Sequence, residues 1–310
     1  MKHEGRHQFD SARRAPPASV HIDLDGGVEI FEGHGWRYAS GRDPIFDTGL
    51  RGFLSFLAEH RIRATLFVVA RSLHNPEKRG LIEAAVEQGH EIASHSLTHR
   101  YLTSLDTAGK HEEIGASRRL LEQELGITVR GFRAPGYRID YESLEILAAH
   151  GYEYDSSAFP TARYATALHS TVERLRAPHH PVAGQALVEW PMPDHRPFPL
   201  PFNPSYALLL GGWLFRAGLD RFRRTGRPLT LLYHLIDLAA PLPAGELPGV
   251  AARVFTLSMM SAERKRARCG AMLDRVRQQY RLMTTLEAVE EWRAAEPHRP
   301  ALQPAGSGHA

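Results

Sequence analysis

Short apolar runs and longer segments with helical spacing of apolar residues alternate along this chain. The apolar runs predict strands at 20–24, 64–69, 91–94, 129–132, 152–154, 187–190 and 229–233. The helical spacing predicts helices at 44–60, 81–88, 106–125, 140–150, 205–224, 262–280 and 284–292. Regular alternation of strand and helix as far as Asp155 is typical of a mostly parallel α/β sheet or barrel.

The polar ends of the chain are predicted to be disordered, at residues 1–17 and 296–310, with one folded domain at 18–295 between them. Residues 1–17 contain no apolar stretch, which is unlike a standard secretory signal. No apolar window is long enough to span a bilayer. We therefore expect a cytoplasmic protein.

Composition narrows the class of protein further. A chain of 310 residues with 43% hydrophobic and 24% charged residues is typical of a soluble globular protein. The net charge is only +3 and Arg and Lys are mostly interleaved with Asp and Glu, so no nucleic-acid partner is predicted. Cys269 is the only cysteine, which excludes an intrachain disulfide and a thiolate metal cluster.

The unusual polar residues follow the ends of predicted strands. In parallel α/β architectures the carboxyl ends of the strands collect catalytic side chains and bind ligands. The residues at these positions are Asp23, Asp25, His95, His99, Arg133, Asp155 and His234.

Two imidazoles and a carboxylate in this set suit one divalent metal ion. His95 and His99 are four residues apart and can face one point, and Asp25 completes an open arrangement of three ligands. Zinc is the first choice, with cobalt, manganese, iron and nickel as alternatives. Asp23 is then a general base or a fourth ligand. The plainer alternative is that the two histidines only cap a loop.

Five sequence motifs in one order resemble the polysaccharide deacetylase family (carbohydrate esterase family 4) from about residue 20 to 237. The motifs are Ile22-Asp23-Leu24-Asp25-Gly26, His95-Ser96-Leu97-Thr98-His99, Arg133-Ala134-Pro135, Tyr154-Asp155-Ser156-Ser157 and Leu231-Leu232-Tyr233-His234. The resemblance implies a distorted (β/α) barrel with a metal site at the carboxyl-terminal rim of the strands. Most family members have adjacent aspartates, whereas Leu24 separates them here, which leaves the substrate open.

The resemblance also implies roles for the motif residues. Asp23 is expected to be the general base, and His234 the general acid that protonates the leaving amine. Arg133 is expected to pair with Asp23, and Asp155 to support His234. The backbone N–H of Tyr137 is the candidate donor to the oxyanion.

The function expected from these residues is metal-dependent removal of an N-acyl group, acetyl first, from an amino sugar or its conjugate in a cytoplasmic biosynthetic pathway. The partner is then a small-molecule or lipid-linked amino sugar. The alternatives are deformylation, O-deacetylation, hydrolysis of another non-peptide or cyclic amide, and a binding protein that keeps the site without turnover.

Two further segments bear on the substrate. The 26–42 loop contains Trp36 and is either a sugar subsite or an ordinary packed loop. The apolar 198–215 segment, followed by arginines up to Arg224, is better explained as a buried helix. Its alternative is peripheral contact through 198–224 with the inner membrane surface.

Overall fold

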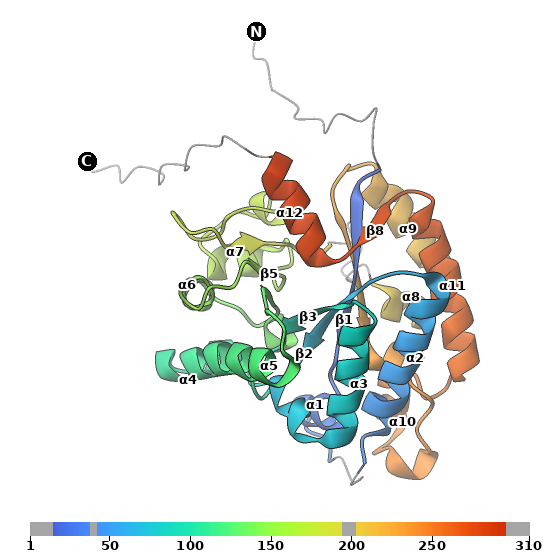
Figure 1. Ribbon diagram of the computed structural model, residues 1–310. Helices are drawn as coiled ribbons and strands as arrows, with labels where there is room; N and C mark the ends of the chain where they lie inside the picture. Colours follow the sequence, from blue (N-terminus) through green and yellow to red (C-terminus); the bar gives the residue numbers. More distant parts are fainter. Residues whose placement is uncertain (1–14, 38–41, 194–202, 296–310) are drawn as a thin grey trace. The chain divides into compact units, whose positions relative to one another are not determined.

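The computed structural model describes residues 15–37, 42–193 and 203–295 (Figure 1). The rest of the chain, including 1–14 and 296–310 for which we predict disorder, lies outside the described residues. Two compact units are present: unit 1 comprises 1–68, 72–92 and 193–285, and unit 2 comprises 69–71, 93–192 and 286–310.

Unit 1 is built on parallel strands around β1. Its strands are β1 (Pro17–Asp23), β2 (Thr65–Val68), β7 (Leu229–His234) and β8 (Arg281–Met283). Both β2 and β7 pair with β1 in parallel, and β8 pairs with the start of β1. The side chains of β1 and β7 are almost entirely buried. This burial of both faces is the pattern of a parallel sheet covered by helices.

The helices of unit 1 pack beside these strands, with α8 against β7 and α11 against α8 and α9 (Figure 1). They are α1 (Gly27–Gly33), α2 (Pro44–His60), α3 (Pro76–Glu87), α8 (Pro204–Leu210), α9 (Gly212–Arg223), α10 (Val250–Phe255) and α11 (Ala262–Arg277). Helix α2 begins at a proline after Asp43, whose side chain accepts the N–H of Phe46, a standard N-cap.

Unit 2 has its own parallel ladder, in the order β3-β4-β5-β6. The strands are β3 (Glu91–Ser94), whose last two residues belong to unit 2, β4 (Gly131–Phe132), β5 (Tyr154–Asp155) and β6 (Val188–Glu189). The helices are α4 (Thr107–His111), a π-helix (Glu112–Ala116), α5 (Ser117–Leu125), α6 (Tyr141–Ala149), α7 (Ala162–Ala167) and α12 (Thr285–Ala295).

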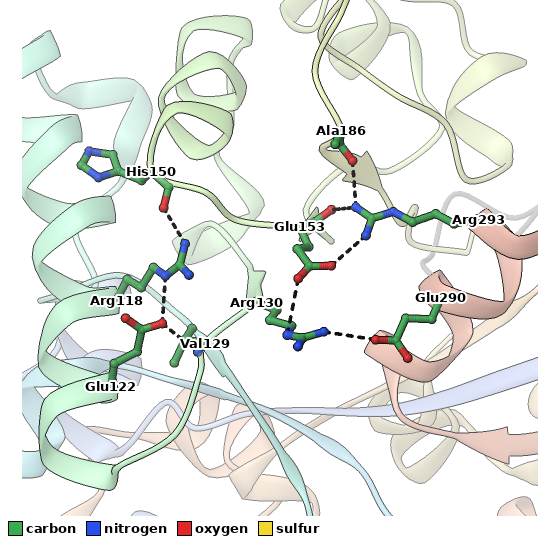
Figure 2. Close-up of polar contacts among 9 residues, drawn as sticks. All are labelled: Arg118, Glu122, Val129, Arg130, His150, Glu153, Ala186, Glu290 and Arg293. Atoms are coloured by element: carbon green, nitrogen blue, oxygen red, sulfur yellow. Dashed lines mark hydrogen bonds and ion pairs between the residues drawn. The ribbon is translucent and has the colours of Figure 1, made fainter. Parts of the chain in front are cut away.

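Arginine side chains hold the segments of unit 2 that lead into its short strands (Figure 2). Arg293 of α12 binds the Glu153 carboxylate at 2.7 Å and the carbonyl oxygens of Glu153 and Ala186 at 3.0 and 2.8 Å. Arg130 contacts Glu153 at 3.4 Å and Glu290 of α12 at 3.1 Å. These groups are partly exposed, so the network orders the segments more than it stabilises them.

Most predicted elements are confirmed, and the exceptions have physical causes. Residues 27–33 of the predicted loop form α1. The predicted 205–224 helix is divided at Gly211, whose φ of 109° no other residue adopts easily. Pro17, predicted to be disordered, begins β1, and β8 is an additional strand.

The apolar 198–215 segment is partly buried where the structure describes it. Helix α9 buries Leu214, Phe215 and Leu219, as the preferred interpretation requires, while Leu209 and Trp213 are 43% and 58% exposed. Residues 198–202 lie outside the described part of the chain. Within the described residues, every helix is too short or too polar to traverse a bilayer.

Helix α2 packs so closely on the turn after β7 that only glycine fits at residue 49. A Cβ at Gly49 would lie 2.7 Å from the carbonyl oxygen of Leu235. Gly80 in α3 is a matched control, because a Cβ there would meet nothing within 4 Å. Both positions are helical, so the intrinsic gain from alanine is the same.

We predict that Gly49→Ala lowers the free energy of unfolding by about 1–2 kcal/mol, because overpacking outweighs the helix gain. Gly80→Ala should raise it by about 0.5–1 kcal/mol. Equilibrium unfolding in urea measures both. Equal stabilisation by the two substitutions would contradict the tight contact between α2 and Leu235.

Candidate active site

The carboxyl ends of β1 and β7 bring an acid and an imidazole together in unit 1. Asp23 and His234 are register partners on these parallel strands. His234 Nε2 lies 3.9 Å from Asp23 Oδ2. Asp23 is 1% exposed and the His234 side chain 23% exposed, so only the imidazole reaches solvent. The pair can therefore move protons at one point.

The turn after Asp25 is held by acidic side chains. The N–H of Gly26 donates to Glu29 at 3.0 Å, and the N–H of Gly27 donates to Asp43 at 2.8 Å. Lys78 donates to the other oxygen of Asp43 at 2.7 Å. A Cβ at Gly26 would lie 2.1 Å from Asp43, so the close approach needs glycine there. These contacts fix the backbone that carries Asp25.

A second buried network holds the turn that follows His234. Asp237 accepts the N–H of His234 at 2.9 Å and the hydroxyl of Ser205 at 2.8 Å. Lys265 donates to the carbonyl oxygens of Ile236 and Ala239 at 2.8 and 2.9 Å. Burial lowers the pKa of Lys265 to about 8, although the nearby Asp237 acts to raise it. Burial also raises the pKa of Asp237. Neither Asp237 nor Lys265 was predicted from the sequence.

In unit 2 the His95–His99 loop is tied to a π-helical turn. Leu97 N–H donates to the carbonyl oxygen of Glu113 at 3.1 Å. Both the N–H and the hydroxyl of Thr98 donate to the Glu113 carboxylate. Ser96 and His99 have φ of 67° and 66°, so the loop is also strained. π-Helical turns are frequent at functional sites, and this one presents Glu113 to the loop.

The two histidines are arranged as a pair of metal ligands would be. Each offers a nitrogen, and these nitrogens lie within 4.8 Å of each other. His95 Nδ1 lies 2.8 Å from the carbonyl oxygen of Arg133, which can only accept, so Nδ1 carries the hydrogen. The lone pair is therefore on Nε2, the orientation that a backbone carbonyl gives a ligating imidazole.

Arg133 is completely buried at the end of β4. Its guanidinium donates to the carbonyl oxygen of Ser156 at 2.7 Å, to the Ser156 hydroxyl at 3.1 Å and to the Met192 sulfur at 3.2 Å. The N–H of Tyr137 donates to the carbonyl oxygen of Ala134 at 2.9 Å. Donation from this N–H to an oxyanion stays a prediction. It requires the hydrogen bond to the Ala134 carbonyl oxygen to break or to be shared with the oxyanion.

Asp155 pairs with a second acid that the sequence did not reveal. Glu189 is its register partner on β6, and both carboxyl groups are fully buried. Ser157 donates to Asp155 through its hydroxyl at 2.7 Å and its N–H at 3.1 Å. Ala158 N–H donates to Glu189 at 3.0 Å. Burial and the neighbouring Asp155 raise the pKa of Glu189 well above its usual value, so Glu189 holds a proton for Asp155.

The same serine joins this pair to the Arg133 segment. Ala134 N–H donates to the Ser157 hydroxyl oxygen at 2.8 Å. Burial raises the pKa of Asp155, while Glu189, Ser157 and Arg133 oppose that rise. A single hydrogen-bonded path therefore runs from Glu189 to the backbone beside Arg133. The only sequence signal for Glu189 was its place in the short run before Trp190.

The structure thus places the predicted residues in two groups. Unit 1 joins Asp23 with His234, and unit 2 joins His95, Arg133 and Asp155 through neighbouring segments. The pairing of Arg133 with Asp23, and of Asp155 with His234, stays a prediction.

The acids and imidazoles of both units lie at or just after the carboxyl ends of parallel strands. The chain is similar to the polysaccharide deacetylase family, whose model matches residues 43–154. That match contains His95, His99 and Arg133, whereas the motifs of Asp23, Asp25, Asp155 and His234 lie wholly or partly outside it.

Two curated relatives are similar to part of the chain. A peptidoglycan deacetylase-like protein, FGM2, from Gibberella zeae is 37% identical over 24% of this chain and 22% of its own length. A chitooligosaccharide deacetylase from Bradyrhizobium sp. is 33% identical over 29% of this chain and 43% of its own length. The matches therefore span less than half of each relative.

The fold is similar over almost the whole chain to that of a protein assigned as a polysaccharide deacetylase from Mycobacterium smegmatis. The two share 19% identity with a TM-score of 0.62, covering 96% of each chain. The predicted α/β fold of the polysaccharide deacetylase type is confirmed.

The substitution Glu189→Gln tests whether Glu189 holds a proton beside Asp155. The folded state holds the Glu189 proton to higher pH than the unfolded state does, so its contribution to stability is lost as pH rises above the usual glutamate range. The amide of Gln cannot lose a proton but still donates to Asp155. We predict that the variant gains stability relative to wild type as pH rises from about 5 to about 8.

Denaturant unfolding at several pH values measures this difference, with the exposed Glu145→Gln as control. Parallel stability curves for wild type and Glu189→Gln would show that Glu189 is ionised in the folded state.

Proposed function

We propose that this chain is a metal-dependent hydrolase that removes an N-acetyl group from an amino sugar or an amino-sugar conjugate. The observation that carries the proposal is the pair of Asp23 and His234, 3.9 Å apart. Amide hydrolysis needs a base for water and an acid for the departing nitrogen, and this pair supplies both. A chitooligosaccharide deacetylase among the relatives supports a sugar-linked acyl group.

We propose that Asp25, His95 and His99 hold one divalent ion. Imidazole nitrogens and a carboxylate oxygen suit zinc first and cobalt, manganese, iron or nickel as alternatives. The orientation of His95 by the Arg133 carbonyl supports this use of its Nε2. An ion bound there would polarise the acyl carbonyl and make water easier to deprotonate.

The chain's own residues then divide the proton transfers. Asp23 takes a proton from the attacking water as the C–O bond forms at the acyl carbon. His234 delivers a proton to the nitrogen as the C–N bond breaks, which leaves acetate and a free amine. Arg133 orients Asp23 and Asp155 supports His234 in this proposal. The burial of Asp23 keeps its carboxylate away from bulk water.

The setting of the substrate is also part of the proposal. We favour a small-molecule or lipid-linked amino sugar in a cytoplasmic biosynthetic pathway. For a lipid-linked substrate, peripheral contact with an anionic membrane surface through 198–224 is supported by exposed Leu210 and Trp213 beside exposed Arg216.

Product analysis tests the reaction. N-acetyl and N-formyl amino sugars, each free, nucleotide-linked and lipid-linked, are incubated with zinc-loaded and with chelator-stripped protein. We expect acetate only from the metal-loaded protein. Formate in place of acetate would assign a deformylase, and metal-bound protein that releases neither would redirect the site to a non-sugar amide.

Two substitutions test the acid and the base. We expect Asp23→Asn and His234→Ala each to lower kcat by about 10²–10⁴-fold, as loss of a general base or acid does. Metal content by atomic emission should stay at the wild-type level in both. The surface variant Asp47→Asn, in α2, should keep full activity. Near-normal turnover by His234→Ala would remove His234 from the acid role.

A further inference from the structure

Unit 1 contains a pocket of about 590 Å³ that none of the motifs accounts for. It lies where α2 ends and β2 begins, and the end of α11 and β8 complete its wall. Its volume is within the range of small-molecule sites, about 300–1,000 Å³. Asp23 and His234 lie at the opposite, carboxyl ends of the strands of this unit, so the pocket is separate from the acid–base pair.

The lining of this pocket combines cationic and apolar side chains. Arg61, Arg63 and Arg277 line it together with apolar residues that include Leu57 and Leu282. Arg277 is held in place because its guanidinium donates to the carbonyl oxygen of His60. Among the described residues, no Asp or Glu lines the pocket. Three guanidinium groups without a carboxylate favour a ligand with more than one negative charge.

His90 adds a buried donor to the same wall. It is 8% exposed, and its Nδ1 accepts the N–H of Ala64 at 3.3 Å. Burial, with a smaller effect of Arg63, lowers the pKa of His90 to about 4, so the ring is neutral at pH 7 and carries its hydrogen on Nε2. This N–H has no hydrogen-bond partner in the part of the chain that the structure describes. A buried donor of this kind is costly unless something accepts from it.

We propose that this pocket binds a phosphorylated small molecule, with the phosphoryl group on Arg61, Arg63 and Arg277 and the organic part on the apolar lining residues. A guanidinium group can donate two parallel N–H bonds to the oxygens of a phosphate. This geometry matches a phosphate better than a monovalent anion. The His90 N–H supplies a neutral donor to the same ligand. The site is independent of the proposed deacetylase reaction.

Isothermal titration calorimetry on the full, zinc-loaded chain tests this site, with pyrophosphate and adenosine monophosphate as probes at constant ionic strength. We expect saturable binding of at least one probe at one site per chain. Arg63→Gln and Arg277→Gln should each weaken it about tenfold or more, as expected for a lost hydrogen bond to a charged group. Arg264→Gln, an exposed arginine near the start of α11, is the matched control and should bind as wild type does.

A phosphoryl probe could instead occupy the candidate metal centre, so His95→Gln separates the two sites. Binding that survives His95→Gln and is weakened by Arg63→Gln supports the pocket. Binding lost in His95→Gln but kept in Arg63→Gln would overturn the proposal, and so would the absence of saturable binding of both probes. Loss of acetate release alone would bear on the deacetylase proposal and leave this one unchanged.

Discussion

The parallel pairing of β1 with β7 is the constraint on which the site in unit 1 depends. The register sets Asp23 opposite His234, and a slip of one residue would turn one of the two side chains to the other face of the sheet. Burial of both strands makes such a slip costly, because it would exchange side chains between two buried faces and place polar groups among apolar ones. The geometry of the Asp23–His234 pair is therefore a consequence of core packing.

Buried charged side chains outside the motifs order the turns that carry the motif residues. Asp43 binds the backbone after Asp25, Asp237 and Lys265 hold the turn after His234, and Glu113 holds the histidine loop. Each of these contacts gives a hydrogen-bond partner to a backbone group that would otherwise lack one. Each also fixes the direction of a neighbouring side chain. The precision of the site thus depends on residues that perform no chemistry themselves.

The sequence predicted the elements whose signals are local. Pro44–His60 and Glu91–Ser94 have the predicted bounds, because the proline start, the helical spacing and the position before the histidine loop all lie within the segment. Helix α1 was missed because Asp43, sixteen residues from Gly27, accepts the first N–H of the helix. Glu189 was missed for a similar reason, since its partner Asp155 is distant in sequence and adjacent only across the ladder. The motif residues were found because each follows or ends a strand.

The π-helical turn at Glu112–Ala116 gives this chain an unusual sensitivity to length. A π-helical turn contains one residue more than a turn of α-helix. Here α4 precedes the π-helical turn and α5 follows it. Deleting a single residue would let the whole segment close into a regular helix and rotate Glu113 by about 100° away from the loop. The histidines would then lose their anchor although no motif residue had changed. A family comparison by motif alone would not detect that loss, whereas a comparison by spacing would.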